Sequence, residues 1–317
     1  MIASLKRLSV VVCTHRRPQG LADLLASLRP LIDGRGDREL IVVNDGTHGP
    51  AYDAVVAPYQ HMMTYDPLPA PVGIAKARNR SAALAKGEFL VFTDDDCVVP
   101  DHWLDWLDAR LRQWPELDVV AGTTRGRDVR QANFVGRVQS HYRLLPTASS
   151  DARGGQRFVT ANLAVRRALF NTLGGFNTQP SFAVAGEDTE LASRLTRHSA
   201  RTCIDQNWHV DHLLARRLGP ELRRFRRYGF ANGLMALERG GPRSRQSTHE
   251  PTYRGLVERF LSHLRWTTEL AASYPGNRVT RLASCVAAAS IQTAYDLGVV
   301  AGANARRRRQ MGPDGHE

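Results

Sequence analysis

Cysteine, lysine and aromatic residues are scarce in this chain of 317 residues. The four cysteines stand far apart in the sequence, at Cys13, Cys97, Cys203 and Cys285. No pair has the spacing of a redox motif or a zinc site, so we expect reduced thiols and a cytoplasmic protein. Only three of the 43 basic residues are lysines, and such an arginine excess is typical of a GC-rich genome. The net charge of +12 is therefore weak support for nucleic-acid binding.

Long uninterrupted hydrophobic runs are also missing. The apolar run over residues 8–13 is too short for a signal peptide and meets a basic segment at once. The most apolar later stretch, residues 282–302, contains Gln292 and Asp296 and is mostly alanine and serine. A membrane-spanning helix needs about 20 predominantly apolar residues, so we expect this stretch not to be a span.

Charge is distributed unevenly along the chain. Residues 216–317 carry 18 arginines and 8 acidic residues, a net charge of +10, whereas the first 215 residues carry only +2. We expect a first domain over residues 1–217, a helical and basic region over residues 218–305, and a disordered tail over residues 306–317.

Short apolar runs alternate with helical patterns in the first half. Strands are predicted over residues 8–13, 39–45, 62–66, 88–93, 117–121, 157–166 and 202–205, and helices over residues 20–31, 74–86, 101–114 and 187–198. This alternation predicts an α/β fold with a mostly parallel sheet and helices on both faces. Trp103 and Trp106, three residues apart on one predicted helix, are assigned to the core.

Acidic residues follow two of the predicted strands. Asp45 ends one, and Asp94, Asp95 and Asp96 follow another, at the sheet edge where open α/β sheets bind ligands. Three adjacent carboxylates repel one another unless donor groups or a cation offset them. A divalent cation whose coordination shell is completed by nucleotide phosphates would offset this repulsion. The alternative is a solvated acidic turn that caps the next helix.

These residues lie within a set of motifs that resembles the family-2 glycosyltransferases of the GT-A fold. The motifs occur in the family's order over roughly residues 7–215: SVVVCTHR (9–16), ELIVVNDGT (39–47), GIAKARN (73–79), AKGEFLVFTDDD (85–96), GGF (174–176) and GEDTEL (186–191). The resemblance implies a Rossmann-like GT-A domain, a nucleotide-sugar donor, Mn²⁺ or Mg²⁺ as cofactor, and inversion at the sugar. The Gln-x-x-Arg-Trp signature of processive synthases is missing from the sequence, which favours a single transfer.

The resemblance also implies roles for individual residues. Asp188 matches the general base, and Asp96 matches the metal ligand of the Asp-x-Asp motif. The positions matching nucleotide contacts are Thr14, His15, Arg16, Asp45, Arg78, Asp94 and Asp95. The positions bordering the donor sugar and acceptor are Gly174, Gly175, Phe176 and Glu187. Cys13, His15, Arg16 and Asn44 depart from the usual family residues, which leaves uridine and thymidine both open as the nucleoside.

Two histidines are candidates for a further metal ligand. His209 and His212 follow the last predicted strand, where GT-A enzymes often place a histidine, and the spacing favours His212. A structural role at the surface or core edge is the alternative for either residue.

The sequence predicts an inverting glycosyltransferase that moves a sugar from a nucleoside diphosphate sugar, UDP being preferred, to an acceptor hydroxyl or amine. The acceptor is a small molecule, glycan or lipid. A nucleotidyltransferase is an alternative, although residues 13–17 contain no glycine for a phosphate loop. A basic nucleic-acid or membrane-binding module is another. The run Arg223–Tyr228 is a solvated helix face, or it meets an anionic acceptor or the inner face of a membrane; nucleic acid is not expected as a partner.

Overall fold

The computed structural model describes residues 7–142, 144, 148–150, 156–179, 186–235 and 254–310. The chain forms two compact units. The first unit comprises residues 1–127, 145–183 and 187–213, and the second comprises residues 128–144, 184–186 and 214–317. The sequence boundary near residue 217 is close to the last of these divisions, but part of the segment 125–156 also joins the second unit.

The first unit is built on an eight-stranded sheet in the order β3-β2-β1-β4-β9-β6-β10-β5. Its strands are β1 (Leu8–Thr14), β2 (Arg38–Asn44), β3 (Met63–Pro67), β4 (Phe89–Asp94), β5 (Cys97–Val98), β6 (Val119–Gly126), β9 (Leu163–Arg166) and β10 (Thr202–His212). Strands β3, β2, β1 and β4 are parallel, as β6 and β10 are, whereas β9 is antiparallel to both of its neighbours and β5 to β10. The predicted mostly parallel sheet is confirmed.

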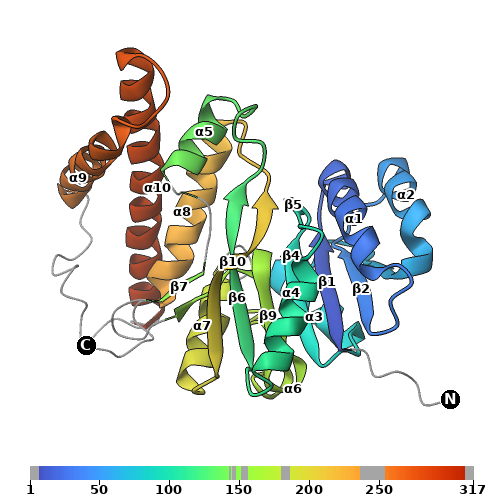
Figure 1. Cartoon of the computed structure of the whole chain (residues 1–317). Coiled ribbons are helices and arrows are strands. Elements are labelled where there is room, and N and C mark those ends of the chain that lie inside the picture. The colour runs from blue at the N-terminus through green and yellow to red at the C-terminus, as the bar shows by residue number, and fades with distance from the viewer. Residues whose placement is uncertain are drawn as a thin grey trace. The chain divides into compact units, whose positions relative to one another are not determined.

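Helices cover both faces of this sheet (Figure 1). They are α1 (Pro18–Ile32), α2 (Pro50–Val56), α3 (Ile74–Leu84), α4 (Trp103–Gln113), α6 (Arg167–Thr172) and α7 (Glu187–Arg197), with 3-10 turns η1 (Ala57–Met62) and η2 (Thr160–Asn162). Alternate residues of β1 enter different cores: Val10 and Val12 pack with α1 and α4, and Val11 and Cys13 with α3 and α7. This two-sided burial explains why the strand is apolar throughout.

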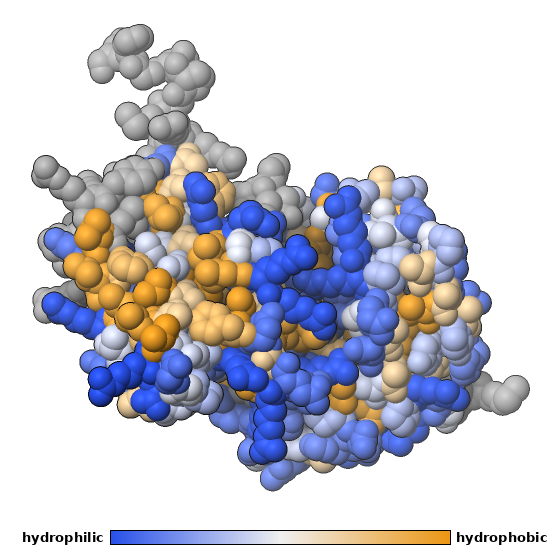
Figure 2. Space-filling view, turned by 90° about the horizontal axis from the view of Figure 1, so that it is seen from above, coloured by the Kyte–Doolittle hydropathy of each residue, from blue (hydrophilic) through white to orange (hydrophobic). Residues whose placement is uncertain are grey.

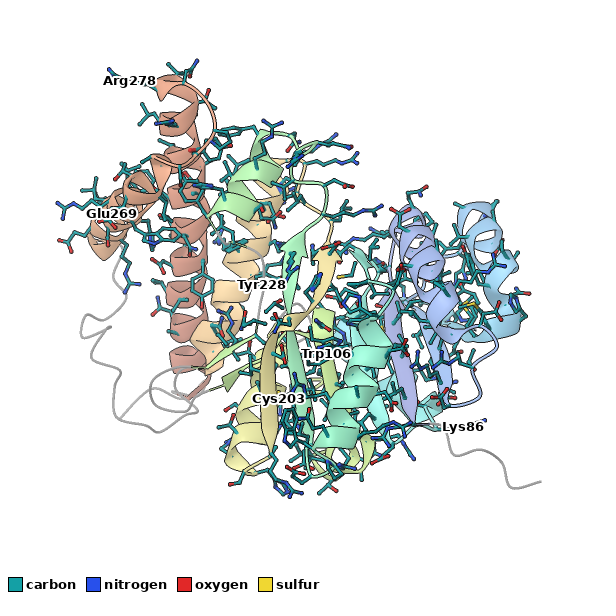
Figure 3. The ribbon with its side chains drawn as sticks, viewed as in Figure 1. Lys86, Trp106, Cys203, Tyr228, Glu269 and Arg278 are labelled. Carbon is teal, nitrogen blue, oxygen red and sulfur yellow. The ribbon has the colours of Figure 1, made fainter. Side chains whose placement is uncertain are left out.

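Three tryptophans join α4 to β10. The ring of Trp208 stacks on Trp103 and Trp106, with centroids 5.7 and 6.0 Å apart, and Trp208 Nε1 donates to the Trp103 carbonyl. Figure 3 shows Trp106 on the side of α4 that faces β10. The assignment of Trp103 to the core is correct, since its side chain is fully buried.

Two predicted strands differ from the structure. The strand expected over residues 157–166 is divided into β8 (Gln156–Arg157), which pairs with β7 (Ser149–Ser150), η2 and β9. At this break Asn162 lies in η2, and its side-chain amide accepts from Trp103 Nε1 and donates to the Trp208 carbonyl. The strand expected over residues 202–205 continues to His212 after an irregularity between Ile204 and His209. Both candidate histidines therefore lie on β10 and not after it.

The second unit contains α5 (Phe134–His141), α8 (Leu218–Met235), α9 (Arg254–Ala271) and α10 (Arg278–Gln310). This confirms the helical C-terminal region. Its core gathers Val138 of α5 and Tyr142, directly after this helix, with Phe225 of α8 and Ile291 of α10. Helix α10 continues to Gln310, into the segment expected to be disordered from residue 306, and residues 311–317 lie outside the described residues.

Helices α8 and α10 cross at close range through glycines. A Cβ on Gly298 would lie 1.9 Å from the Arg226 carbonyl oxygen, and one on Gly229 would lie 1.9 Å from that of Tyr295. By length and composition, the part of α10 over Arg278–Ala305 is able to cross a membrane, and nearly half of its most apolar stretch is buried within the structure. Core helices of soluble proteins also have this length and composition, so the prediction that it is not a span remains a prediction.

Candidate active site at the carboxyl edge of the sheet

The parallel register brings three predicted site segments to one edge of the sheet. Thr14 at the end of β1 pairs with Asn44 at the end of β2, and Cys13 pairs with Asp94 at the end of β4. The loops after these strands carry the acidic residues found in the sequence. The aligned strand ends, and not proximity in the chain, bring Asp45 and the aspartates of residues 94–96 to this edge.

Asp45 supports the loop that leads into α3. Its carboxylate accepts hydrogen bonds from the backbone N–H groups of Val72, at 2.6 Å, and Gly73, at 3.1 Å. His15 contacts the Asp45 carbonyl oxygen through Nδ1 at 2.7 Å, and its ring is exposed. Gly46 is required at this turn, because its φ is +68° and a Cβ would lie 2.2 Å from Pro71 N. Arg16 is exposed beside it and its backbone N–H donates to Thr47 Oγ1.

The three adjacent aspartates have different surroundings. Asp94 accepts from the guanidinium of Arg78 at 2.6 Å. Asp95 is buried and accepts from Thr14 Oγ1 at 2.7 Å and from Arg17 at 3.1 Å, and burial raises the pKa of Asp95 to about 6. Asp95 thereby fastens the loop between β1 and α1 to the end of β4, whereas Asp94 bonds across to α3.

Asp96 lies between two potential cations. Arg17 donates to its Oδ2 at 2.6 Å, and Nε2 of His212 lies 3.4 Å from its Oδ1. Leu213 N–H donates to the Asp96 carbonyl and so connects the end of β10 to this turn. His209 points elsewhere: its Nε2 lies 3.2 Å from Arg125, and its Nδ1 contacts Asn207. Of the two candidate histidines, the structure brings His212 to Asp96.

The tautomer of His212 bears on whether a metal fits here. Nδ1 lies 2.8 Å from the Leu213 carbonyl oxygen, which can only accept, so Nδ1 carries the proton. In the neutral ring Nε2 is then an acceptor that faces a carboxylate oxygen, another acceptor. Such a pair is stabilised by a proton or a metal cation between the two atoms, and a histidine whose other nitrogen bonds a carbonyl is a typical metal ligand.

Cys97 is close to these ligands but has another role. Potential ligand atoms of Asp96, Cys97 and His212 all lie within 4.8 Å of one another. The thiol is fully buried in the core with α1 and α4, and burial raises its pKa well above the ordinary value. A thiol must lose its proton to bind a metal, so the neutral Cys97 is a poor ligand. Asp96 and His212 are the residues whose chemistry fits a divalent cation.

Arg78 joins the nucleotide side of the site to the predicted base. Its buried guanidinium donates to Asp94 at 2.6 Å and to Glu187 Oε1 at 2.5 Å. Burial raises the pKa of Glu187 to about 7, and the adjacent Arg78 opposes this shift. Arg78 is thus fixed by two carboxylates from different elements, β4 and α7.

Asp188 and Glu187 begin α7, where the helix dipole favours negative charge. Asp188 Oδ1 accepts from the backbone N–H of Thr189 at 2.6 Å. Burial raises the pKa of Asp188, and Arg78 acts in the opposite direction. Because a raised pKa makes a carboxylate a stronger base, this environment suits proton acceptance.

The glycine loop is fixed by the side chain of Asn79, a residue for which no role is predicted above. Asn79 donates to the Phe176 carbonyl at 2.9 Å and accepts from the Phe176 N–H at 2.8 Å. Gly174 and Gly175 have φ angles of +77° and +72°, and a Cβ on Gly175 would lie 2.6 Å from Asn79 Oδ1. Phe176 itself is buried. The position of Asn79 directly after Arg78 in the GIAKARN motif was the available signal.

Comparison with known proteins places this geometry in a family. The family model described as "Glycosyl transferase family 2" matches residues 9–174. Succinoglycan biosynthesis protein ExoM of Rhizobium meliloti (strain 1021) is 30% identical over 193 residues, which are 58% of this chain and 59% of that protein. The putative polypeptide N-acetylgalactosaminyltransferase 13 of Drosophila melanogaster is 29% identical over 161 residues, 46% of this chain and 28% of that protein. The chain therefore spans less than two thirds of the length of each.

Two solved structures share the fold. The mannosyltransferase PcManGT from Pyrobaculum calidifontis, in complex with GDP-Man and Mn²⁺, has a TM-score of 0.63 and 18% identity, over 93% of this chain and 87% of that chain. TarS 1–349 of S. aureus in complex with UDP has a TM-score of 0.52 and 16% identity, over 96% of this chain and 92% of that chain. At these identities the likeness shows the fold, and it confirms the GT-A architecture predicted from the motifs.

Proposed function

Because the chain belongs to glycosyl transferase family 2, we propose that it transfers one sugar from a nucleoside diphosphate sugar, with inversion, to an acceptor hydroxyl or amine. Membership decides between the enzyme classes that the sequence left open: the protein is a glycosyltransferase. The finer points, namely the nucleotide, the metal, the stereochemistry and the base, are the proposal. The observation that carries it is the facing pair of Asp96 and His212 at the carboxyl edge of the sheet.

The donor nucleotide occupies the carboxyl edge of the sheet in this proposal. Thr14, His15 and Asp45 stand at the uracil and ribose end, and Arg78 and Asp94 at the ribose and phosphate side. UDP is the proposed nucleotide, and TarS, which shares the fold, is known in complex with UDP. The mannosyltransferase with GDP-Man has the same fold, so the choice of nucleoside is tested directly below.

Asp96 and His212 would hold the divalent cation, which stabilises the negative charge that develops on the leaving diphosphate. A carboxylate together with an imidazole suits Mn²⁺ better than Mg²⁺, which prefers oxygen ligands alone. The Mn²⁺ bound with GDP-Man in the Pyrobaculum enzyme is consistent with this choice. Asp94 pairs with Arg78, and Asp95 bonds the loop of residues 14–17, so neither is proposed as a metal ligand.

Asp188 is the proposed general base. It accepts the proton of the acceptor hydroxyl or amine as that group attacks the anomeric carbon. A single direct displacement of the diphosphate inverts the configuration at this carbon. Glu187 orients Arg78 through its ion pair, and Gly174, Gly175 and Phe176 form the loop proposed to border the donor sugar and the acceptor.

We place the protein in the cytoplasm, in peripheral contact with an anionic membrane surface. Seven apolar side chains of α9 and α10 are exposed and form what we call the apolar hairpin surface: Val257, Leu261, Trp266, Leu270, Val279, Leu282 and Val286. Hydrophobic residues gather at the left of Figure 2, where α9 and α10 lie in Figure 1. Arg278, at the tip of the hairpin in Figure 3, and Arg265 are exposed nearby and complement anionic headgroups.

The basic run Arg223–Tyr228 on α8 exposes fewer side chains to an anionic partner than its sequence indicates. Phe225 is buried, and Arg224 pairs with Glu221 and lies over the Phe225 and Tyr228 rings. Arg223, Arg226 and Arg227 are exposed and are the residues proposed to meet an anionic acceptor or headgroup.

A donor screen tests the proposed reaction. Purified protein is incubated with UDP-, dTDP- and GDP-sugars and Mn²⁺, and released nucleoside diphosphate is measured with and without excess EDTA. We expect release from UDP-sugars in Mn²⁺, abolition by EDTA, and loss of activity in Asp96→Asn with an intact fold. Full activity in EDTA would remove the metal from the mechanism, and release only from GDP- or dTDP-sugars would correct the nucleotide. Glu88→Gln, at an exposed ion pair with Arg166, is the matched control.

A further inference from the structure

Arg17 occupies the position from which a cation would neutralise Asp96. It lies in the turn between β1 and α1, and one nitrogen, NH1, contacts Asp95 Oδ1 at 3.1 Å and Asp96 Oδ2 at 2.6 Å. The aspartate side chains are nearly buried, whereas the Arg17 side chain is 52% exposed. One guanidinium therefore supplies positive charge to two carboxylates from the solvent side.

A divalent cation at Asp96 and His212 conflicts with this arrangement. Arg17 and His212 approach opposite oxygens of the same carboxylate. A metal that bound Asp96 would place two positive charges within a few Å of the guanidinium, and like charges at such distances repel strongly. The metal would also withdraw the negative charge that holds Arg17 in place.

The backbone of Arg17 is anchored by contacts that do not involve its guanidinium. The backbone N–H of Arg17 donates to Tyr52 OH at 2.8 Å, and Tyr52 OH also contacts Thr14 Oγ1. Among the described residues, the half-exposed guanidinium is held by its ion pairs with Asp95 and Asp96. An arginine side chain is long and flexible, and a bound metal would supply the positive charge that the two nearly buried carboxylates lose when Arg17 leaves them.

We infer that Arg17 is an internal counter-ion of the metal site, which the metal–nucleotide complex displaces and which then binds the diphosphate of the donor. The inference rests on the proposed metal site and adds a residue and an order of binding to it. Without nucleotide, Arg17 competes with the metal for Asp96, so Mn²⁺ alone binds weakly. With nucleotide, the guanidinium exchanges two carboxylates for phosphate oxygens, which its planar donors match.

The inference predicts opposite effects of one substitution on two affinities. Arg17→Gln removes the competitor, so Mn²⁺ alone should bind about fivefold more tightly, the scale of a partly exposed ion pair. The same variant lacks the charge that binds the diphosphate, so UDP should bind about tenfold more weakly at saturating Mn²⁺, the scale of a charge-assisted hydrogen bond. If Arg17 had only a structural role, Arg17→Gln would weaken the affinities for Mn²⁺ and for UDP together.

Electron paramagnetic resonance of free Mn²⁺, titrated with protein, measures the first affinity, and calorimetric titration with UDP in Mn²⁺ measures the second. The control is Arg29→Gln, which removes an exposed arginine from α1, the helix that follows Arg17, and should change neither affinity. Arg17→Lys keeps the charge without the planar fork, so it should bind Mn²⁺ like the wild type and UDP more weakly. Thermal unfolding of each variant reports whether the fold is intact.

The outcomes separate this inference from the proposed function. If the Arg17→Gln variant binds Mn²⁺ no more tightly than the wild type, the inference is overturned while the metal site stands. The same holds if the variant binds UDP as well as the wild type does. Wild-type protein that binds Mn²⁺ neither alone nor with UDP overturns the metal site and the inference together. If Arg17→Gln does not fold, a gain in UDP affinity or a changed Mn²⁺ affinity in Arg17→Lys overturns the inference.

Discussion

Asp188 is a carboxylate at the first turn of α7, with one oxygen bonded to the Thr189 N–H. Asp188→Asn keeps the shape of the side chain but cannot accept a proton. Because general-base catalysis contributes about 10²–10⁴-fold, kcat should fall by that factor while UDP affinity in Mn²⁺ stays near that of the wild type. Steady-state kinetics and calorimetric titration check the two parts. A kcat within threefold of the wild type would remove Asp188 from the mechanism.

The pH dependence follows from the surroundings of the same residue. Burial raises the pKa of Asp188 above its ordinary value of 3.8, and the base acts only when it is deprotonated. Activity, measured as kcat/KM, should therefore fall as the pH decreases through this raised pKa and reach a plateau above it. Circular dichroism at each pH excludes unfolding as the cause.

Asp95, with a pKa of about 6, and Glu187, with a pKa of about 7, are competing explanations for an acidic limb. Protonation of Asp95 would loosen Thr14 and Arg17, and protonation of Glu187 would loosen Arg78. The residual activity of Asp188→Asn distinguishes these explanations from Asp188 itself. If Asp188 causes the limb, the variant loses it, and if the limb persists in the variant, Asp95, Glu187 or another group is responsible.

The predictability of single residues depends on whether their role is local. The aspartates of residues 94–96 follow a buried strand directly, so their place at the sheet edge was readable from the sequence. Arg17 carries no such signal, because its contact with Asp96 depends on the fold of a loop from β1 against the end of β4. Asn79 stood in a recognised motif, but its bonds to Phe176 join residues far apart in the chain.

At the scale of elements, the strands β1, β2 and β4 were predicted because both their faces are buried, which makes them continuous apolar runs. Most of β10 was missed because residues 205–207 are polar and partly exposed where its pairing is irregular. This miss mattered for the site, since β10 is the strand that carries His212 to Asp96. The helix α5 was hidden in a segment without clear periodicity, and its N-cap Asn133 was the remaining signal.

The crossing of α8 and α10 gives a prediction at this scale. A Cβ on Gly298 would meet the Arg226 carbonyl oxygen, a backbone atom that moves only with its helix. Gly298→Ala should therefore lower the free energy of unfolding by about 1–3 kcal/mol, as overpacking does, despite the better helix propensity of alanine. Thermal denaturation monitored by circular dichroism measures the change.

Gly219→Ala is the matched control for this crossing. Gly219 is also on α8, but a Cβ there would lie 3.7 Å from the end of the Arg223 side chain. Its stability should be unchanged or slightly raised. Equal stability of the Gly298→Ala variant and the wild type would show that the two helices do not approach as closely as described.

At the scale of the whole molecule, the two units differ in chemistry. The sequence up to residue 215 is nearly neutral, and the donor and metal residues all belong to the first unit. The remaining sequence carries a net charge of +10, and its helices expose the apolar hairpin surface. Sequence arithmetic revealed the charge, but the exposed face was not predictable, because it depends on which sides of α9 and α10 their partners cover.

The apolar hairpin surface supplies the last prediction. Val279, Leu282 and Val286 are 76%, 61% and 43% exposed on α10, and burial of apolar area in a membrane interface is favourable by about 25 cal/mol per Å². Replacing all three by serine should weaken binding to vesicles that contain anionic phosphatidylglycerol by at least about tenfold, with donor binding unchanged.

Arg265→Gln with Arg278→Gln should weaken vesicle binding further by about 1 kcal/mol per charge, and more at low salt. Val129→Ser, an exposed valine of the same unit outside the surface, is the control. Vesicle co-sedimentation at several salt concentrations measures all of these. Wild-type protein that stays in the supernatant with anionic vesicles, or triple-serine protein that still sediments fully, would show that this surface does not meet a membrane.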